Sequence, residues 1–337
     1  LRNLKNYLRM SLRNEAYNSI KKKMRRLIVM DKISIIIPCF NEEEALPIYY
    51  AEMKKVMDSM KKQTSFELLF VDDGSSDRTY EIMKDLHRKD GRCQYLSFSR
   101  NFGKEAAIYA GLKEAKGDYV GLMDVDLQDP PSLLLDMYKG IKEEGYDCVA
   151  SRRVTRKGEP VIRSFFARLF YKIINKISDA NITDGARDFR LMTRPMVDAI
   201  ISMAEKDRFS KGIFGWVGFD IKWLEYENID RVAGHTKWSF KKLLKYALGG
   251  IEDFSSVPLK INLFFTALAF VSTLGLGTWM IVYAILGKYI PLLLSISSVI
   301  SLFSMFIFIG LAVISAYIKK IYKESKGRPI YIIKEKK

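Results

Sequence analysis

The sequence predicts an α/β fold with a mostly parallel sheet and helices on both faces, followed by a C-terminal hairpin of two transmembrane helices. The first observation is that short apolar, β-rich runs alternate with helical stretches between residues 33 and 255. Such alternation is typical of strand–helix–strand units with parallel strands. The second is that residues 261–287 and 289–318 carry no charged side chain, whereas about 20 apolar residues suffice for one span.

The first 150 residues are expected to hold most of the sheet. Each strand is predicted from a short run rich in Ile, Val, Leu, Phe or Tyr, and each helix from apolar residues at helical spacing. Strands are expected at 33–37, 67–71, 94–98, 119–123 and 148–150, and helices at 43–60, 78–88, 104–115 and 131–144. Ligands of parallel sheets bind beyond the carboxyl ends of the strands, so functional residues are sought there.

Composition excludes several function classes. The chain holds three Cys and two His, too few for the usual zinc patterns, and an odd Cys count argues against a disulfide framework. Gly-x-Gly-x-x-Gly and Walker-type loops are absent, which argues against dinucleotide dehydrogenases and P-loop enzymes. The formal charge of +16 suits nucleic acid or an anionic membrane. Because much of the basic excess flanks the predicted spans, anionic membrane lipids are the expected partner and nucleic acid is not.

The basic flanks also orient the predicted spans. Lysines precede the first span and follow the second, so the positive-inside rule predicts a multi-pass cell-membrane protein with the α/β domain and both termini in the cytoplasm. The alternative is a buried helical hairpin. The expected segments are a basic amphipathic segment or solvated tail at 1–30, the cytoplasmic domain at 31–235, amphipathic juxtamembrane helices at 236–259, spans at 260–287 and 289–318, and a basic tail at 319–337.

Two strand ends carry acidic residues. Asp124 and Asp126 follow the fourth strand, and carboxylates this close repel each other unless a cation or hydrogen-bond donors compensate. Oxygen ligands of this kind suit Mg²⁺ or Mn²⁺. After the second strand, Gly74 permits a tight turn, while Asp73 and Asp77 offer acceptors to a base or ribose. Ordinary turn chemistry is the alternative for that second motif.

Four motifs in order carry a resemblance to a known family. They are Ser-Ile-Ile-Ile-Pro-Cys-Phe-Asn-Glu at 34–42, Val-Asp-Asp-Gly-Ser-Ser-Asp at 71–77, Ser-Arg-Asn-Phe-Gly-Lys at 99–104 and Asp-Val-Asp-Leu-Gln-Asp-Pro-Pro at 124–131. Together they resemble an inverting family 2 glycosyltransferase with the GT-A fold. With the paired C-terminal spans, residues 31–318 more narrowly resemble the polyprenyl-phosphate glycosyltransferases, relatives of dolichol-phosphate mannose synthase and bactoprenol glucosyltransferase.

The resemblance implies roles on the donor side. Asp124 and Asp126 match the family's metal site, and Gln128 matches its diphosphate site. Lys104 follows the third strand in a stretch that lies near the donor in relatives, although it also suits a basic helix start. The positions that match the family's base and ribose site are Pro38, Phe40, Glu42, Val71 and Asp73.

On the acceptor side, Asp188 resembles the family Asp near the sugar's anomeric carbon, with Asp184 as a competitor. A lipid monophosphate has a second pKa of about 6, so it needs little help from a base, and Asp188 either accepts a proton or orients groups. The phosphate does require cations. The candidates for binding it are Arg152, which best matches the family, and Arg163, Arg190, Arg208 and Lys211.

The expected function is metal-dependent, inverting transfer of one sugar from a nucleotide-sugar, UDP-glucose or UDP-N-acetylglucosamine, to undecaprenyl or another polyprenyl phosphate. Asp126 and Asp188 are the expected catalytic residues. No Gln-x-x-Arg-Trp element of processive synthases occurs, which favours single transfer for cell-envelope glycan modification. The alternatives are a different lipid acceptor and a non-catalytic nucleotide-sugar-binding membrane scaffold. Gly275 and Gly277 in the first span permit close helix contact and thus a homo-oligomer.

Overall fold

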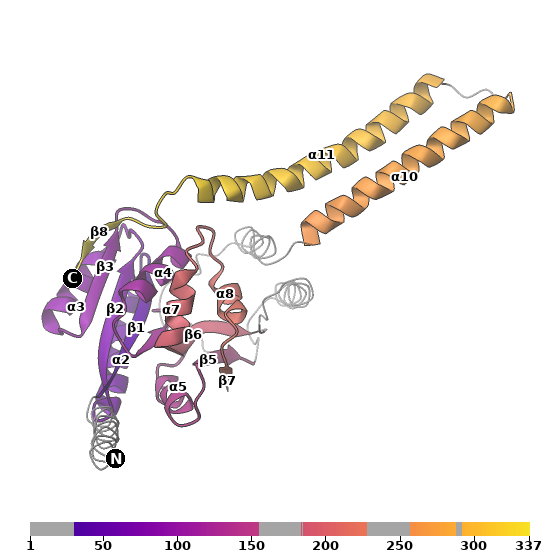
Figure 1. Cartoon of the computed structure of the whole chain (residues 1–337). Coiled ribbons are helices and arrows are strands. Elements are labelled where there is room, and N and C mark those ends of the chain that lie inside the picture. The colour runs from indigo at the N-terminus through magenta and orange to yellow at the C-terminus, as the bar shows by residue number, and fades with distance from the viewer. Residues whose placement is uncertain (1–29, 155–182, 184, 228–256, 288–291) are drawn as a thin grey trace, which may run out of the picture.

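The computed structural model describes residues 30–154, 183, 185–227, 257–287 and 292–337 (Figure 1). Within this described part, eight strands form one sheet in the order β7-β5-β6-β4-β1-β2-β3-β8. Their bounds are β1 Asp31–Cys39, β2 Thr64–Asp72, β3 Cys93–Phe98, β4 Tyr119–Leu122, β5 Cys148–Arg153, β6 Ala186–Thr193, β7 Ile221–Tyr226 and β8 Ile333–Lys336. The predicted segments 1–30 and 236–259 fall almost entirely outside the described residues.

The sheet is mixed. Strands β1, β2, β3 and β4 pair in parallel, as the strand–helix alternation predicts. Strand β6 runs antiparallel between β4 and β5, and β8 runs antiparallel along β3. The predicted α/β fold is confirmed, but the sheet is less uniformly parallel than expected because β6 and β8 return against the common direction.

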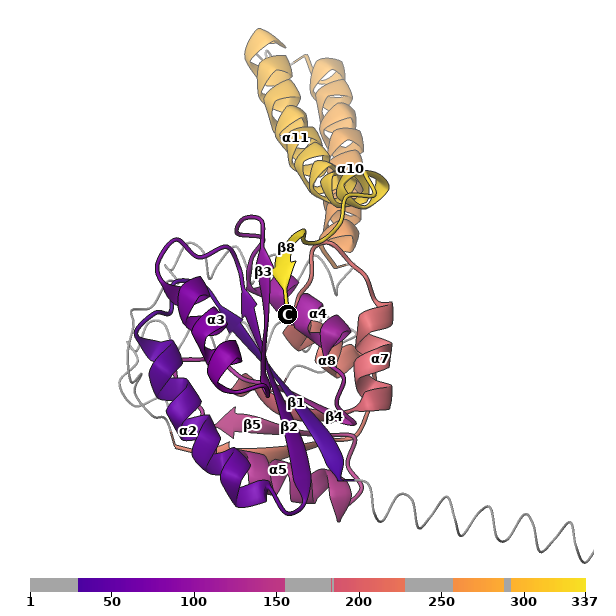
Figure 2. The same cartoon turned by 90° about the vertical axis from the view of Figure 1, so that its left-hand side faces the viewer.

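Helices cover both faces of the sheet (Figures 1 and 2). One face carries α2 (Ala45–Met60), α3 (Thr79–Lys89) and α5 (Leu133–Lys142), and the other carries α4 (Lys104–Glu114), α7 (Arg194–Ser202) and α8 (Ser210–Trp216). In β1 the side chains of Ile35 and Ile37 enter the first core and that of Ile36 enters the second. A strand buried on both faces reads as a continuous apolar run, which is why β1 was predictable.

Two long helices lie between strands β7 and β8 in the chain. Helix α10 (Val257–Ile285) and helix α11 (Leu292–Ser325) lie side by side and extend away from the sheet (Figures 1 and 2). Their contact includes stacked rings of Phe265 and Phe306, with centroids 5.9 Å apart. Among the described residues, one helical segment, Leu302–Ser325, is long and apolar enough to cross a membrane.

The C-terminal residues return to the sheet. Lys323, near the end of α11, forms a 2.7 Å ion pair with Asp207, and β8 then closes the sheet edge beside β3. The ring of Tyr331 stacks on Phe98 at 5.1 Å, and Glu335 accepts hydrogen bonds from two tyrosines of the domain. The residues expected to form a basic tail thus include the last turns of α11 and an edge strand. The polar sequence Ile-Lys-Glu-Lys gave no apolar run from which to predict that strand.

Candidate active site

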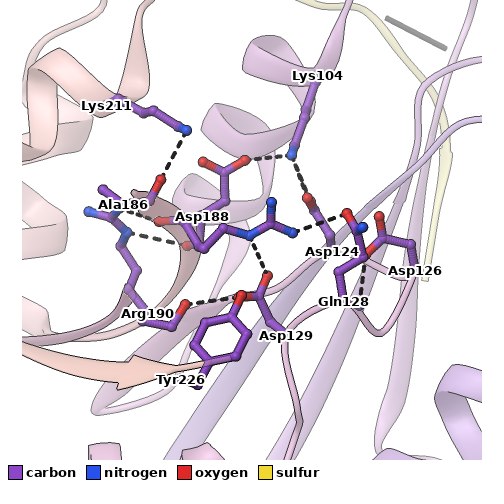
Figure 3. Close-up of polar contacts among 12 residues, drawn as sticks. Lys104, Asp124, Asp126, Gln128, Asp129, Ala186, Asp188, Arg190, Lys211 and Tyr226 are labelled. Atoms are coloured by element: carbon purple, nitrogen blue, oxygen red, sulfur yellow. Dashed lines mark hydrogen bonds and ion pairs between the residues drawn. The ribbon is translucent and has the colours of Figure 1, made fainter. Parts of the chain in front are cut away.

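The carboxyl end of β4 and the start of β6 bring two aspartates together. Leu122 of β4 pairs with Arg190 of β6 in the antiparallel register. Continuing that register by two residues places Asp124 opposite Asp188. Lys104, the first residue of α4, reaches both aspartates (Figure 3).

Lys104 joins these two aspartates. Its Nζ lies 2.7 Å from Asp124 Oδ1 and 2.5 Å from Asp188 Oδ2. Burial raises the pKa of Asp188, but the charges of Lys104, Lys211 and Arg190 and the hydrogen bond from Lys104 together outweigh burial and hold this pKa well below its usual range. Burial lowers the pKa of Lys104, and the two carboxylates outweigh it and raise that pKa above its usual value. Lys104 and Asp188 are therefore both charged across the neutral pH range.

The acidic pair after β4 has a defined geometry. Asp126 is almost fully buried, and its carboxylate accepts the Gln128 backbone N–H at 3.2 Å across a turn in which Leu127 has φ of 54°. No cluster of three or more metal-binding side chains occurs in the described part of the chain. Two aspartates fit Mg²⁺ or Mn²⁺ nevertheless, because Mg²⁺ commonly takes one or two carboxylates and completes its shell with substrate phosphates and water.

Backbone N–H groups hold the turn after β2, which is predicted to bind the sugar donor. The Asp73 carboxylate accepts the N–H groups of Phe102 at 2.6 Å and Gly103 at 2.9 Å. Burial raises the pKa of Asp73 to about 6, although these two donors oppose the shift. Gly74 has φ of 70°, and a Cβ there would lie 2.4 Å from the carbonyl carbon of Arg100, so only glycine fits. The loops after β2 and β3 therefore hold each other.

The other donor-side candidates lie at the ends of β1 and β2, as predicted. The Glu42 N–H donates to Thr79 Oγ1 at 2.7 Å, which joins the loop after β1 to the start of α3. Pro38 and Phe40 are half-buried at the end of β1. Val71 has no exposed surface and packs in the core, so it offers a ligand no side-chain contact. The binding roles of these residues stay predictions.

The acceptor-side candidates divide into two groups. Arg190 is buried, donates to the carbonyl oxygens of Asp188 at 3.3 Å and Arg187 at 2.9 Å, and lies over the ring of Phe214. Arg208 is also buried, with its guanidinium 4.4 Å from the centroid of the Tyr109 ring and bonded to main-chain carbonyls. These two arginines stabilise the local backbone and are poorly placed to bind a phosphate.

The remaining candidates are more accessible. Lys211 is half-buried and donates to the Ala186 carbonyl at 3.1 Å, close enough for its charge to lower the pKa of Asp188 (Figure 3). Arg152 is partly exposed and lies 3.5 Å from Glu225. The predictions for Arg163 and Asp184 fall outside the described residues.

One cluster of site residues was missed. Arg187 of β6 donates from Nε to Asp129 at 3.3 Å and from Nη2 to Gln128 at 3.2 Å. The buried Asp129 also accepts hydrogen bonds from Ser151 and Tyr226, so β5, β6, β7 and the loop after β4 meet at one carboxylate. Asp129 stands inside the motif at 124–131 and Arg187 directly precedes Asp188, but nothing local in the sequence distinguishes either residue from a surface charge.

Comparison with known proteins supports an enzymatic site. A model described as Glycosyl transferase family 2 matches residues 34–201. The chain is 41% identical over 312 residues to the putative glycosyltransferase CsbB of Bacillus subtilis (strain 168), which covers 90% of this chain and 91% of that protein. It is 39% identical over 319 residues to the bactoprenol glucosyl transferase of Shigella phage SfV, which covers 91% and 99%. The chain belongs to glycosyl transferase family 2.

This family 2 protein is therefore a glycosyltransferase, which confirms both the resemblance and the enzyme class predicted from the motifs. The matched residues 34–201 include Asp73, Lys104, Asp124 and Asp188. Among solved structures, the mannosyltransferase PcManGT from Pyrobaculum calidifontis, in complex with GDP-Man and Mn²⁺, is 16% identical with a TM-score of 0.47 over 88% of each chain.

Proposed function

We propose that this enzyme transfers one sugar from a nucleotide-sugar, UDP-glucose or UDP-N-acetylglucosamine, to a polyprenyl phosphate such as undecaprenyl phosphate at the cytoplasmic face of the membrane. The observation that carries the proposal is the Lys104 ammonium between Asp124 and Asp188, which joins the predicted donor-side and acceptor-side carboxylates in one charged cluster. The phage relative is named a bactoprenol glucosyl transferase and is covered over 99% of its length. Its name supports a lipid acceptor and favours glucose.

The two long helices support a membrane-bound enzyme. Many of their large apolar side chains are exposed, among them Phe270, Trp279, Ile307 and Phe308. Exposed apolar surface on this scale marks an interaction with lipid or protein. We propose that α10 and α11 both span the bilayer, with the α/β domain and both termini in the cytoplasm. The basic residues at the end of α11 then face anionic headgroups, while Gly275 and Gly277, at which an added Cβ would meet no atom of the described residues within 4 Å, are available to a second copy.

The proposed mechanism is a single displacement with inversion. Asp124 and Asp126 would hold a divalent cation, which when bound stabilises charge on the leaving diphosphate. Asp188 is already engaged by an ammonium at 2.5 Å and has little tendency to take a proton. Because the lipid phosphate is largely deprotonated at neutral pH, no base is required, and Asp188 orients Lys104 and the reacting groups. Lys104 and Lys211 offset the negative charge of the two phosphate-bearing substrates.

A transfer assay tests this proposal. Purified full-length protein is incubated with polyprenyl phosphate, Mn²⁺ or Mg²⁺ and a panel of radiolabelled nucleotide-sugars, beside Asp126→Ala. We expect label in the lipid phase for one donor, and loss of that label with Asp126→Ala or a chelator. Asp85→Ala is the matched control, because Asp85 is an exposed carboxylate that pairs with Arg88 on the surface of α3. Binding of UDP without lipid-phase label from any donor would favour another acceptor or a non-catalytic scaffold.

A further inference from the structure

Arg187 is the cation that the predicted site did not include. It is the second residue of β6, directly before Asp188, and its side chain is about one quarter exposed. The carboxylates of Asp124 and Asp188 lie close enough to raise its pKa above the usual value, together with that of Asp129, although burial opposes the shift. Arg187 therefore lies among the same carboxylates that surround Lys104.

The orientation of the Arg187 guanidinium is set by buried groups. Asp129 is 2% exposed and accepts hydrogen bonds from Arg187 Nε at 3.3 Å, from Ser151 Oγ at 3.0 Å and from the Tyr226 hydroxyl (Figure 3). Gln128 Oε1 accepts from Arg187 Nη2 at 3.2 Å. Because Asp129 is itself held by Ser151 of β5 and Tyr226 of β7, the guanidinium keeps its direction before any ligand binds, which lowers the entropy cost of binding.

Part of the guanidinium is left for a ligand. Arginine has five N–H donors in a planar fork. Two of them, on Nε and Nη2, are engaged by Asp129 and Gln128, and no described residue accepts a hydrogen bond from the others. Three donors remain, and two of them, one on Nη1 and one on Nη2, lie along one edge of the guanidinium. Such an edge matches two oxygens of a phosphate.

The neighbouring cations are less suited to this task. The Arg190 guanidinium bonds to main-chain carbonyls under Phe214, and Lys104 is held by two carboxylates. An ammonium is also a point charge and lacks the planar fork of arginine. Arg187 alone among these three combines a fixed direction with an unoccupied donor edge in the described structure.

We propose that Arg187 binds a phosphoryl group of the transfer reaction through its Nη1–Nη2 edge. The inference rests on the proposed function for the identity of the two phosphate-bearing substrates. The phosphoryl oxygens come either from the diphosphate of the nucleotide-sugar or from the monophosphate of the polyprenyl lipid. In both cases Arg187 touches substrate, and Gln128 and Asp129 are positioning residues that act through it.

Direct binding separates the two sources without requiring turnover. Full-length protein is titrated with UDP in one arm and with radiolabelled polyprenyl monophosphate in the other. The variant Arg187→Lys keeps the charge beside Asp129 and removes the fork. The double variant Arg187→Met/Asp129→Asn removes both charges, so that no buried carboxylate loses its cation. Arg88→Met, at an exposed arginine of α3, is the control and should bind both probes as the wild type does.

We expect both Arg187 variants to bind one probe about 10- to 100-fold more weakly, the range for a lost hydrogen bond to a charged group. Weaker binding of UDP identifies the diphosphate, and weaker binding of the lipid identifies the monophosphate. Unchanged affinity for both probes would overturn the proposal. If the variants also unfold at a lower temperature, the role of Arg187 is structural. If the wild type transfers no sugar to lipid, the proposed function fails. Weaker binding of UDP or of the lipid monophosphate by the Arg187 variants would still support phosphate binding by Arg187.

Discussion

Replacement of Lys104 by Met should destabilise the enzyme in a pH-dependent way. In the wild type one ammonium compensates two carboxylates, at 2.7 Å from Asp124 and 2.5 Å from Asp188. The variant keeps the length of the side chain and leaves two carboxylates facing each other without that cation. Both effects, the lost attraction and the new repulsion, act against the folded state.

The size of the effect follows from burial. Removing one partner of a fully buried ion pair costs about 3–5 kcal/mol. Here the side chains are 34% exposed for Lys104, 26% for Asp124 and 17% for Asp188, so solvent screens the interaction. We expect a loss of about 2 kcal/mol in the free energy of unfolding near pH 8, or about 4–8 °C in the unfolding temperature for a domain of this size.

The sign of the pH dependence is fixed by the direction of each pKa shift. The wild-type pKa of Asp188 is lowered, so its contribution to stability is present above the usual value of 3.8 and is lost only as the pH falls below it. The pKa of Lys104 is raised, so its contribution is lost only above the usual value of 10.5. Without Lys104, burial is opposed by less positive charge, so the pKa of Asp188 is higher in the variant than in the wild type, although Lys211 and Arg190 still lower it. The gap between wild type and variant should therefore widen as the pH rises from about 4 to 8.

Thermal unfolding of the detergent-solubilised full chain at several pH values measures this gap. The double variant Lys104→Met/Asp188→Asn should recover much of the lost stability, because one of the two opposed charges is gone. Lys336→Met is the matched control, since Lys336 forms an exposed pair with Glu114 at 3.0 Å that is worth less than about 1 kcal/mol. Equal stability of Lys104→Met and wild type at pH 8, or a gap that does not change with pH, would refute the reasoning.

Two further predictions concern the donor side and the C-terminal strand. Because a protonated Asp73 loses acceptor capacity, the affinity for UDP-glucose, measured by titration of the protein with this ligand at several pH values, should fall as the pH drops through about 6. The variant Asp73→Asn should show no such pH dependence, and an identical pH profile in both proteins would contradict the role of Asp73. Tyr331→Ala should lower the free energy of unfolding by about 2 kcal/mol, because the half-buried ring of Tyr331 stacks on Phe98. The control Tyr322→Ala, at an exposed ring, should change the unfolding temperature little. Equal unfolding temperatures for the two variants would contradict docking of the C-terminal strand.

Much of the fold follows from local patterns. Each of the five predicted strands lies inside one of the strands β1 to β5, except that the fourth extends one residue past the end of β4. The four predicted helices overlap α2, α3, α4 and α5. These elements were predictable because each strand is buried over most of its length and carries an apolar run, while each helix buries apolar residues that recur at helical spacing. Strands β6, β7 and β8 were not predicted, because their burial is partial and Lys, Arg and Glu interrupt their apolar residues.

The acceptor side was harder to predict than the donor side. The acidic motif after β4 stands out in the sequence because two carboxylates two residues apart need compensation. Arginines carry no comparable local signal. Arg190 and Arg208 were expected to bind phosphate, but they are buried against Phe214 and Tyr109 and bonded to carbonyl oxygens. Arg187, one residue before the predicted Asp188, has the more accessible guanidinium.

By itself the sequence determined the parallel half of the sheet, the family, and the strand ends at which the site residues are predicted. Only the tertiary structure decided which charges meet there. Lys104 and Asp188 are 84 residues apart in the chain, and their contact depends on the antiparallel insertion of β6 beside β4. Strand pairing over such a separation is set by the packing of whole elements, whereas apolar periodicity is set within a few residues. A sequence pattern therefore locates each charged group on its own element but does not specify the partner that compensates it.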